Sequence, residues 1–155
     1  MASSTPRTRL LEAINRIEEG YEFLLAYAAQ GYQTEQSTGQ GGQLRSLLDG
    51  MAGAVSDLEG LIREVSASGP HASPEIGAFG RVVSADAARA LAALHLVQAQ
   101  RSISSQLVDN LNASVHLRAL LTDLFLLGEV VAPGADGSVE DAEGEVGKST
   151  RLDAS

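Results

Sequence analysis

The sequence predicts an all-α fold, and three observations support this. Hydrophobic residues make up 44% of the 155 residues but aromatic residues only 4%, so the core must be built from Leu, Ala, Val and Ile, as is typical of packed helices. Two segments repeat apolar residues in alternating steps of four and three. From residue 84 to residue 131 there is no proline and only one glycine. We expect an antiparallel helical hairpin followed by a long C-terminal helix.

The first helix is expected over residues 6 to 31. Thr5 can cap its N-terminus, Pro6 suits the first helical position, and Gly31 is a natural stop. One face of the segment carries apolar side chains at helical spacing, which predicts an amphipathic helix with one buried face. These residues are Leu10, Ile14, Ile17, Tyr21, Leu24 and Ala28.

The second helix is expected after a connector, residues 31 to 43, that is rich in Gly and Gln and lacks aliphatic residues. Its apolar stripe repeats the spacing of the first, which predicts that the two helices pack as an antiparallel pair. The stripe consists of Leu44, Leu48, Met51, Val55, Leu58, Ile62 and Val65. Gly69 and Pro70 then end this helix, and we expect a loop up to Ser84.

The third segment contains a polar stretch, QAQRSISSQLVDNLNAS, at residues 98 to 114. Its serines and asparagines weaken a helix only by a few tenths of a kcal/mol each, roughly, and it contains no true helix breaker. We therefore favour one helix, kinked at most, from Ser84 to Val131, about 70 Å long at ~1.5 Å per residue. The alternative is a break near Asn112, with Ser114 capping a fourth helix of a closed bundle.

The end of this segment is apolar around most of its circumference, and such a helix must be buried on more than one side. If it projects past the hairpin, only another chain can bury it. We therefore expect a bundle completed by oligomerisation, most simply as a two-fold homodimer. The predicted interface residues are Leu117, Leu120, Leu121, Leu124, Phe125, Leu127 and Val131.

Residues 1 to 133 are thus predicted to form one helical domain, while residues 134 to 155 have the acidic, unpatterned composition of a disordered tail. The net charge of −9 argues against nucleic acid as a partner. No segment approaches the ~18 apolar residues of a membrane span, and no secretory leader is apparent. We expect a cytoplasmic protein without a membrane span.

No coherent catalytic cluster is visible in the sequence, so we expect neither an enzyme nor a bound cofactor or metal. Cysteine is absent, which excludes thiolate chemistry. A di-iron bundle needs Glu-x-x-His motifs, and the chain has none. The carboxylates of the first helix lie away from its apolar stripe, and we interpret them as a solvated face. They are Glu12, Glu18, Glu19 and Glu22.

The segment around His116, NASVHLRALL, resembles the helix of histidine phosphotransfer proteins, in which an exposed histidine is followed by a basic residue that helps to hold phosphate. Arg118 is that basic residue here, and the lysine–glycine pair of the usual signature is missing. The resemblance implies a phosphorylated His116. His95, also on a predicted helix, has no such context.

Two function classes remain open. The first, which we favour, is a non-catalytic helical protein that self-associates and acts as an adaptor, assembly factor or regulator through contacts with another protein. The alternative is a helical phosphotransfer or metal-binding protein that uses His116 or the carboxylates of the first helix.

Overall fold

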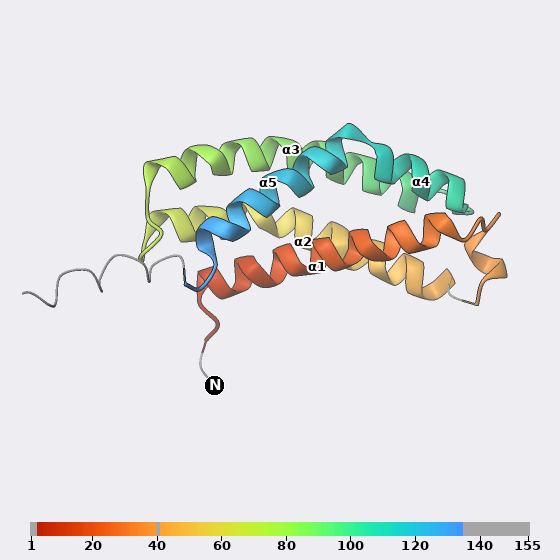
Figure 1. Ribbon diagram of the computed structural model, residues 1–155, viewed down its shortest axis with the longest axis horizontal. Coiled ribbons are helices and arrows are strands. Elements are labelled where there is room, and N and C mark those ends of the chain that lie inside the picture. Colours follow the sequence, from red (N-terminus) through yellow and green to blue (C-terminus); the bar gives the residue numbers. More distant parts are fainter. Residues whose placement is uncertain (1–2, 40, 135–155) are drawn as a thin grey trace, which may run out of the picture.

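The computed structural model describes residues 3–39 and 41–134, which contain α-helices, one short 3-10 helix and no β-strand. The all-α prediction is confirmed. Figure 1 shows that the helices run roughly along one axis and form an elongated bundle. The elements are α1 (Pro6–Ala29), η1 (Glu35–Ser37), α2 (Gly41–Ala67), α3 (Pro74–Gln98), α4 (Ser105–Ala113) and α5 (Val115–Val131).

The bundle has four antiparallel arms, and α4 and α5 together make the fourth (Figure 1). The second arm, α2, packs against both α1 and α3. The fourth arm closes the remaining face, because α4 packs mainly against α1 while α5 packs mainly against α3. The apolar core therefore runs through the centre of a bundle that one chain completes.

The α1–α2 hairpin agrees with the sequence prediction. Thr5 Oγ1 accepts a hydrogen bond from the backbone N–H of Thr8 and caps α1, and Gly31 takes a φ of 70° just after the helix ends. All seven residues of the α2 stripe are buried, as are four of the six in the α1 stripe, and Tyr21 and Ala28 are half-buried.

The start of α3 differs from the prediction, because the helix begins at Pro74 rather than at Ser84. Ser73 Oγ accepts a hydrogen bond from the backbone N–H of Ile76 and caps the helix. The glycines between Pro74 and Ser84 suggested a loop, but one of them, Gly80, allows α2 and α3 to pack closely. A Cβ at this position would lie 2.7 Å from Ile62 Cγ2.

The expected continuous helix from Ser84 to Val131 is wrong. Helix α3 ends at Gln98, residues 99–104 form a loop, and Ser104 caps α4 by accepting a hydrogen bond from the backbone N–H of Leu107. Helix α5 starts after a kink at Ser114, where ψ is 126°. Most of the polar stretch is thus a chain reversal and a short helix. The predicted acidic tail lies almost wholly outside the described residues.

Two helical glycines should respond in opposite directions to replacement by alanine. Gly80→Ala should lower the free energy of unfolding by about 1 kcal/mol, because overpacking against Ile62 outweighs the gain in helix propensity. Gly53→Ala on the exposed side of α2 meets no atom within 4 Å and should raise it by about 1 kcal/mol. Urea denaturation followed by circular dichroism measures both. Stabilisation by both substitutions would show that α2 and α3 are not this close.

Candidate functional site

The predicted interface residues lie mostly inside the bundle. Six of the seven are buried in the core that the chain forms by itself, and only Phe125, at 54% exposed, faces outward. The fourth arm folds back over the open face of the hairpin, so this arm buries its leucines against α1 and α3. The buried residues are Leu117, Leu120, Leu121, Leu124, Leu127 and Val131.

Exposed large apolar side chains nevertheless gather on two neighbouring helices. In the described part of the chain, two of these lie on α3 and four on α5, against one on α1 and none on α2 or α4. Scattered apolar residues on a surface are normal, but a concentration on one face is typical of an interaction surface. They are Val82 and Leu96 on α3, Val115, Phe125, Leu126 and Val130 on α5, and Leu25 on α1.

Three of these side chains share one flank of the α3–α5 seam. The carboxyl of Asp123 on α5 interacts with that of Asp86 on α3, which fixes the register of the two antiparallel helices. Val82 lies one turn before Asp86, while Leu126 and Val130 lie one and two turns after Asp123. Because the two helices run in opposite directions, residues before Asp86 and residues after Asp123 lie toward the same end of the bundle. We call Val82, Leu126 and Val130 the seam patch.

The two aspartates at the edge of the seam patch form an acid pair. The side chain of Asp86 is 20% exposed, and its Oδ1 accepts a hydrogen bond of 3.1 Å from Arg89. Asp123 Oδ2 is buried and finds no hydrogen-bond donor within the described chain. Burial, then hydrogen bonding to Asp86 and the charge of that residue, raise the pKa of Asp123 to about 7. Asp123 therefore exchanges its proton near neutral pH.

A second polar cluster, around Glu35, lies at the end of the bundle where α1 leads into α2. This side chain is 2% exposed, yet it is ionised and well supplied with donors. Its Oε1 accepts from Arg45 Nη2 at 2.6 Å, and its Oε2 accepts from the backbone N–H of Ile103 at 2.5 Å. Burial acts to raise the pKa of Glu35, but these hydrogen bonds and the charge of Arg45 outweigh it and lower the pKa to about 2.

Further hydrogen bonds join this cluster to the start of the fourth arm. Tyr27 Oη donates to the carbonyl of Ile103 at 2.8 Å, and Ser105 Oγ donates to the carbonyl of Tyr27 at 2.7 Å. We call Tyr27, Glu35, Arg45, Ile103 and Ser105 the Glu35 network. Because its polar groups satisfy one another, we interpret it as a structural link between loops rather than as a reactive site.

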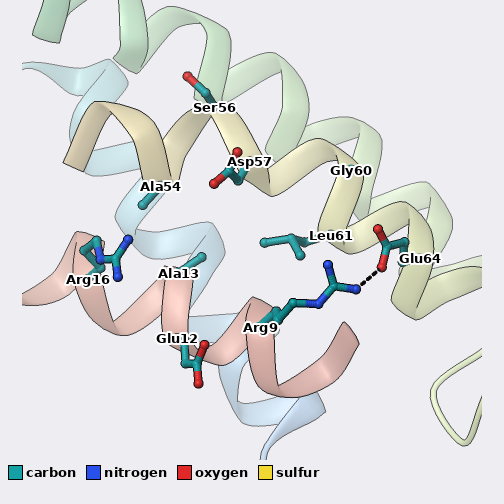
Figure 2. A pocket seen from close by; sticks show the side chains of 10 residues that line it. All are labelled: Arg9, Glu12, Ala13, Arg16, Ala54, Ser56, Asp57, Gly60, Leu61 and Glu64. Carbon is teal, nitrogen blue, oxygen red and sulfur yellow. Dashed lines mark hydrogen bonds and ion pairs between the residues drawn. The ribbon is translucent and has the colours of Figure 1, made fainter. Parts of the chain in front are cut away.

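A groove of about 520 Å³ lies between α1 and α2, and Figure 2 shows its lining side chains. Small residues, Ala13 and Ala54, are among them, and an ion pair between Arg9 and Glu64 joins the two helices. The other charged side chains at the groove are Glu12, Arg16 and Asp57. Charges of both signs therefore line the groove, which gives it no strong preference for a ligand of one sign.

The remaining candidates from the sequence lie apart from these clusters. His116 is exposed in the first turn of α5. Arg118 is two residues further on and lies about 200° around the helix, so the two side chains do not share a face. No group of three or more metal-ligating side chains gathers among the described residues, and the carboxylates of α1 form no such group.

Sequence reasoning missed both polar clusters. Glu35 lies in a connector that carries no periodic signal, so nothing local marks it as buried. Asp123 did have a signal, because it is a lone acid within the run ALLTDLFLL. A charged residue in an apolar run is expected to have a specific partner or a shifted pKa.

Comparison with known proteins gives no further assignment. No protein-family model, curated protein or solved structure matches the chain. Within residues 3–39 and 41–134, no helix has the apolar length that a bilayer-spanning segment needs.

Replacing Glu35 with glutamine should test the Glu35 network. The folded-state pKa of Glu35 lies below its ordinary value of 4.5, so the ionised side chain stabilises the fold above about pH 4.5 and this contribution is lost as the pH falls toward 2. Glu35→Gln should therefore lower the free energy of unfolding by roughly 2 to 3 kcal/mol at pH 7 and by less than about 1 kcal/mol at pH 2.

Chemical denaturation at the two pH values measures the difference. The matched control is Glu59→Gln, which removes an exposed ion pair with Arg63 and should change stability by less than about 1 kcal/mol. An equal loss from Glu35→Gln at both pH values would contradict an ionised Glu35 in the fold.

Proposed function

We propose that this protein is a non-catalytic helical protein that self-associates through the seam patch and serves as an adaptor, assembly factor or regulator. The observation that supports this proposal most strongly is the uneven distribution of exposed large apolar side chains. Of seven in the described residues, six lie on α3 and α5. Leu126 at the centre of the patch is 58% exposed, and covering such a face with a second surface removes apolar area from water.

Charge indicates which face of the bundle a second copy of this chain would cover. The chain carries a net charge of −9, so two copies repel one another over most of their surfaces. The exposed sides of α1 and α2 hold many acids, including Glu19, Glu22 and Asp57. Beside the seam patch, Asp86 is paired with Arg89, and Asp123 holds its proton below about pH 7. Two copies therefore meet with least repulsion when α5 faces α5 across a two-fold axis.

Such a dimer leaves the opposite side of each bundle open. The arms follow one another around the bundle in the order α1, α2, α3 and α4–α5, so the α1–α2 groove lies away from the seam between α3 and α5. This groove, with its charges of both signs, stays exposed in the dimer, where it is available to a further protein. An adaptor needs such an arrangement, in which one surface binds a second copy and a separate surface binds another protein.

Replacing Leu126 with glutamate tests the proposed interface. A carboxylate in the patch should weaken dimerisation by on the order of 2 kcal/mol or more, roughly 30-fold in Kd, because the charge loses its hydration on association. Leu126 is exposed, so the fold of the monomer should be unchanged. Light scattering over a concentration series gives the mass, and circular dichroism checks the fold.

The matched control is Leu25→Glu on α1, where the side chain is 47% exposed and lies outside the patch. This variant should dimerise as the unaltered protein does. A protein that scatters light as a monomer at every concentration, or equal weakening by the two substitutions, would overturn the proposed interface.

A further inference from the structure

We propose that the Asp86–Asp123 acid pair makes self-association through the seam patch dependent on pH, with the singly protonated pair favouring the dimer and the doubly ionised pair opposing it. This inference rests on the proposed self-association. It adds a dependence on pH that the apolar residues of the patch, which do not titrate, cannot provide.

The position of the pair is the first argument. Leu126 follows Asp123 by one helical turn, and Val82 precedes Asp86 by one turn, so the carboxyls lie about 5 Å along the helix axes from the patch. A second copy that covers the patch therefore also covers, or closely approaches, the pair. Charge on the pair is then removed from water when the dimer forms, which is costly for an ion without a partner.

The supply of hydrogen-bond donors is the second argument. Asp123 Oδ2 is buried without a donor in the described chain, whereas the Asp86 carboxylate has Arg89. A proton on Asp123 provides the missing donor, because the resulting O–H can donate to the neighbouring Asp86 carboxylate. The burial of Asp123 and the charge of Asp86 raise its pKa to about 7. The proton is therefore lost as the pH rises through the neutral range.

The surrounding charges do not replace that proton. On the same flank, helix periodicity places Arg89 one turn from Asp86, Glu75 three turns away, and His116 two turns from Asp123. Arg118 lies on another side of α5 by the same reckoning, and Glu129, one turn after Leu126, lies on the side of that residue away from Asp123. From α1, Arg7 donates to the carbonyl of Val131 at the far end of α5.

The charge balance then sets the direction of the effect. With Asp123 protonated, Asp86 and Arg89 neutralise one another, and the acid pair adds no net charge to the flank. Loss of the proton adds one negative charge to this flank of each copy, and a two-fold axis brings the two added charges together. The dimer therefore binds protons more tightly than the monomer. Each copy that gains one proton on association changes Kd by up to about tenfold per pH unit.

Sedimentation equilibrium of the full chain at pH 6.0 and pH 8.5, at constant ionic strength, tests the inference. We expect Kd for the dimer to rise at least tenfold between the two pH values. Asp123→Asn should remove most of this change and keep the dimer tight at pH 8.5, because the amide is neutral and can donate a hydrogen bond to Asp86. Asp86→Asn is a second variant that should also reduce the change, since it removes the charge beside Asp123. The matched control is Glu129→Gln, one turn beyond Leu126 on the side away from Asp123, and it should keep the full pH dependence.

The outcomes separate the two proposals. An unaltered chain that is monomeric at both pH values overturns the self-association and this inference with it. A dimer whose Kd is the same at both pH values overturns this inference alone, as does full pH dependence in both the Asp123→Asn and Asp86→Asn variants.

Discussion

The ionised carboxylate of Glu35, held inside the bundle, is the constraint on which the rest of the structure depends. A buried charge is tolerated only when donors surround it, and the donors of Glu35 come from two distant places, Arg45 on α2 and the backbone of Ile103 in the α3–α4 loop. The same guanidinium also donates to the carbonyls of Gln98 and Gln100, where α3 has ended. The chain therefore reverses at this loop and returns along the bundle as its fourth arm.

The sequence predicted the hairpin because the information for it is local. A cap at Thr5, a stop at Gly31 and an apolar residue on every turn are enough to specify α1 and its partner face. The reversal after Gln98 has no such signal, since its serines and its arginine are acceptable in a helix. Long-range contacts with Arg45 end α3, and the hydrophobic pattern of the segment gives no sign of them. At Gly80 the error was the opposite one: the glycine suggested a loop, but it lies within α3 and allows two helices to approach closely.

The candidate surface was predicted only in part, for a related reason. The leucine-rich run was correctly recognised as needing burial on more than one side, yet a pattern of apolar residues does not say whose atoms bury them. Once the fourth arm folds back, residues such as Leu120 and Leu124 are fully covered by their own chain. The exposed remainder, centred on Leu126, is smaller than the sequence suggested. The acid pair beside it depends on the register between α3 and α5, which only the folded structure supplies.

The hydrogen bond from Arg7 to the carbonyl of Val131, 2.6 Å long, ties the first turn of α1 to the last turn of α5. Four antiparallel arms return the chain to the end where α1 starts (Figure 1). The α2–α3 loop lies at this same end, whereas the Glu35 network lies at the other and draws on both remaining connections between arms. A circular permutation that joins the ends of α1 and α5 through a short linker and opens the chain at Gly69 would therefore keep every contact of that network. We therefore expect the connections at the end where α1 starts to matter less to the fold than the contacts of the Glu35 network at the other end.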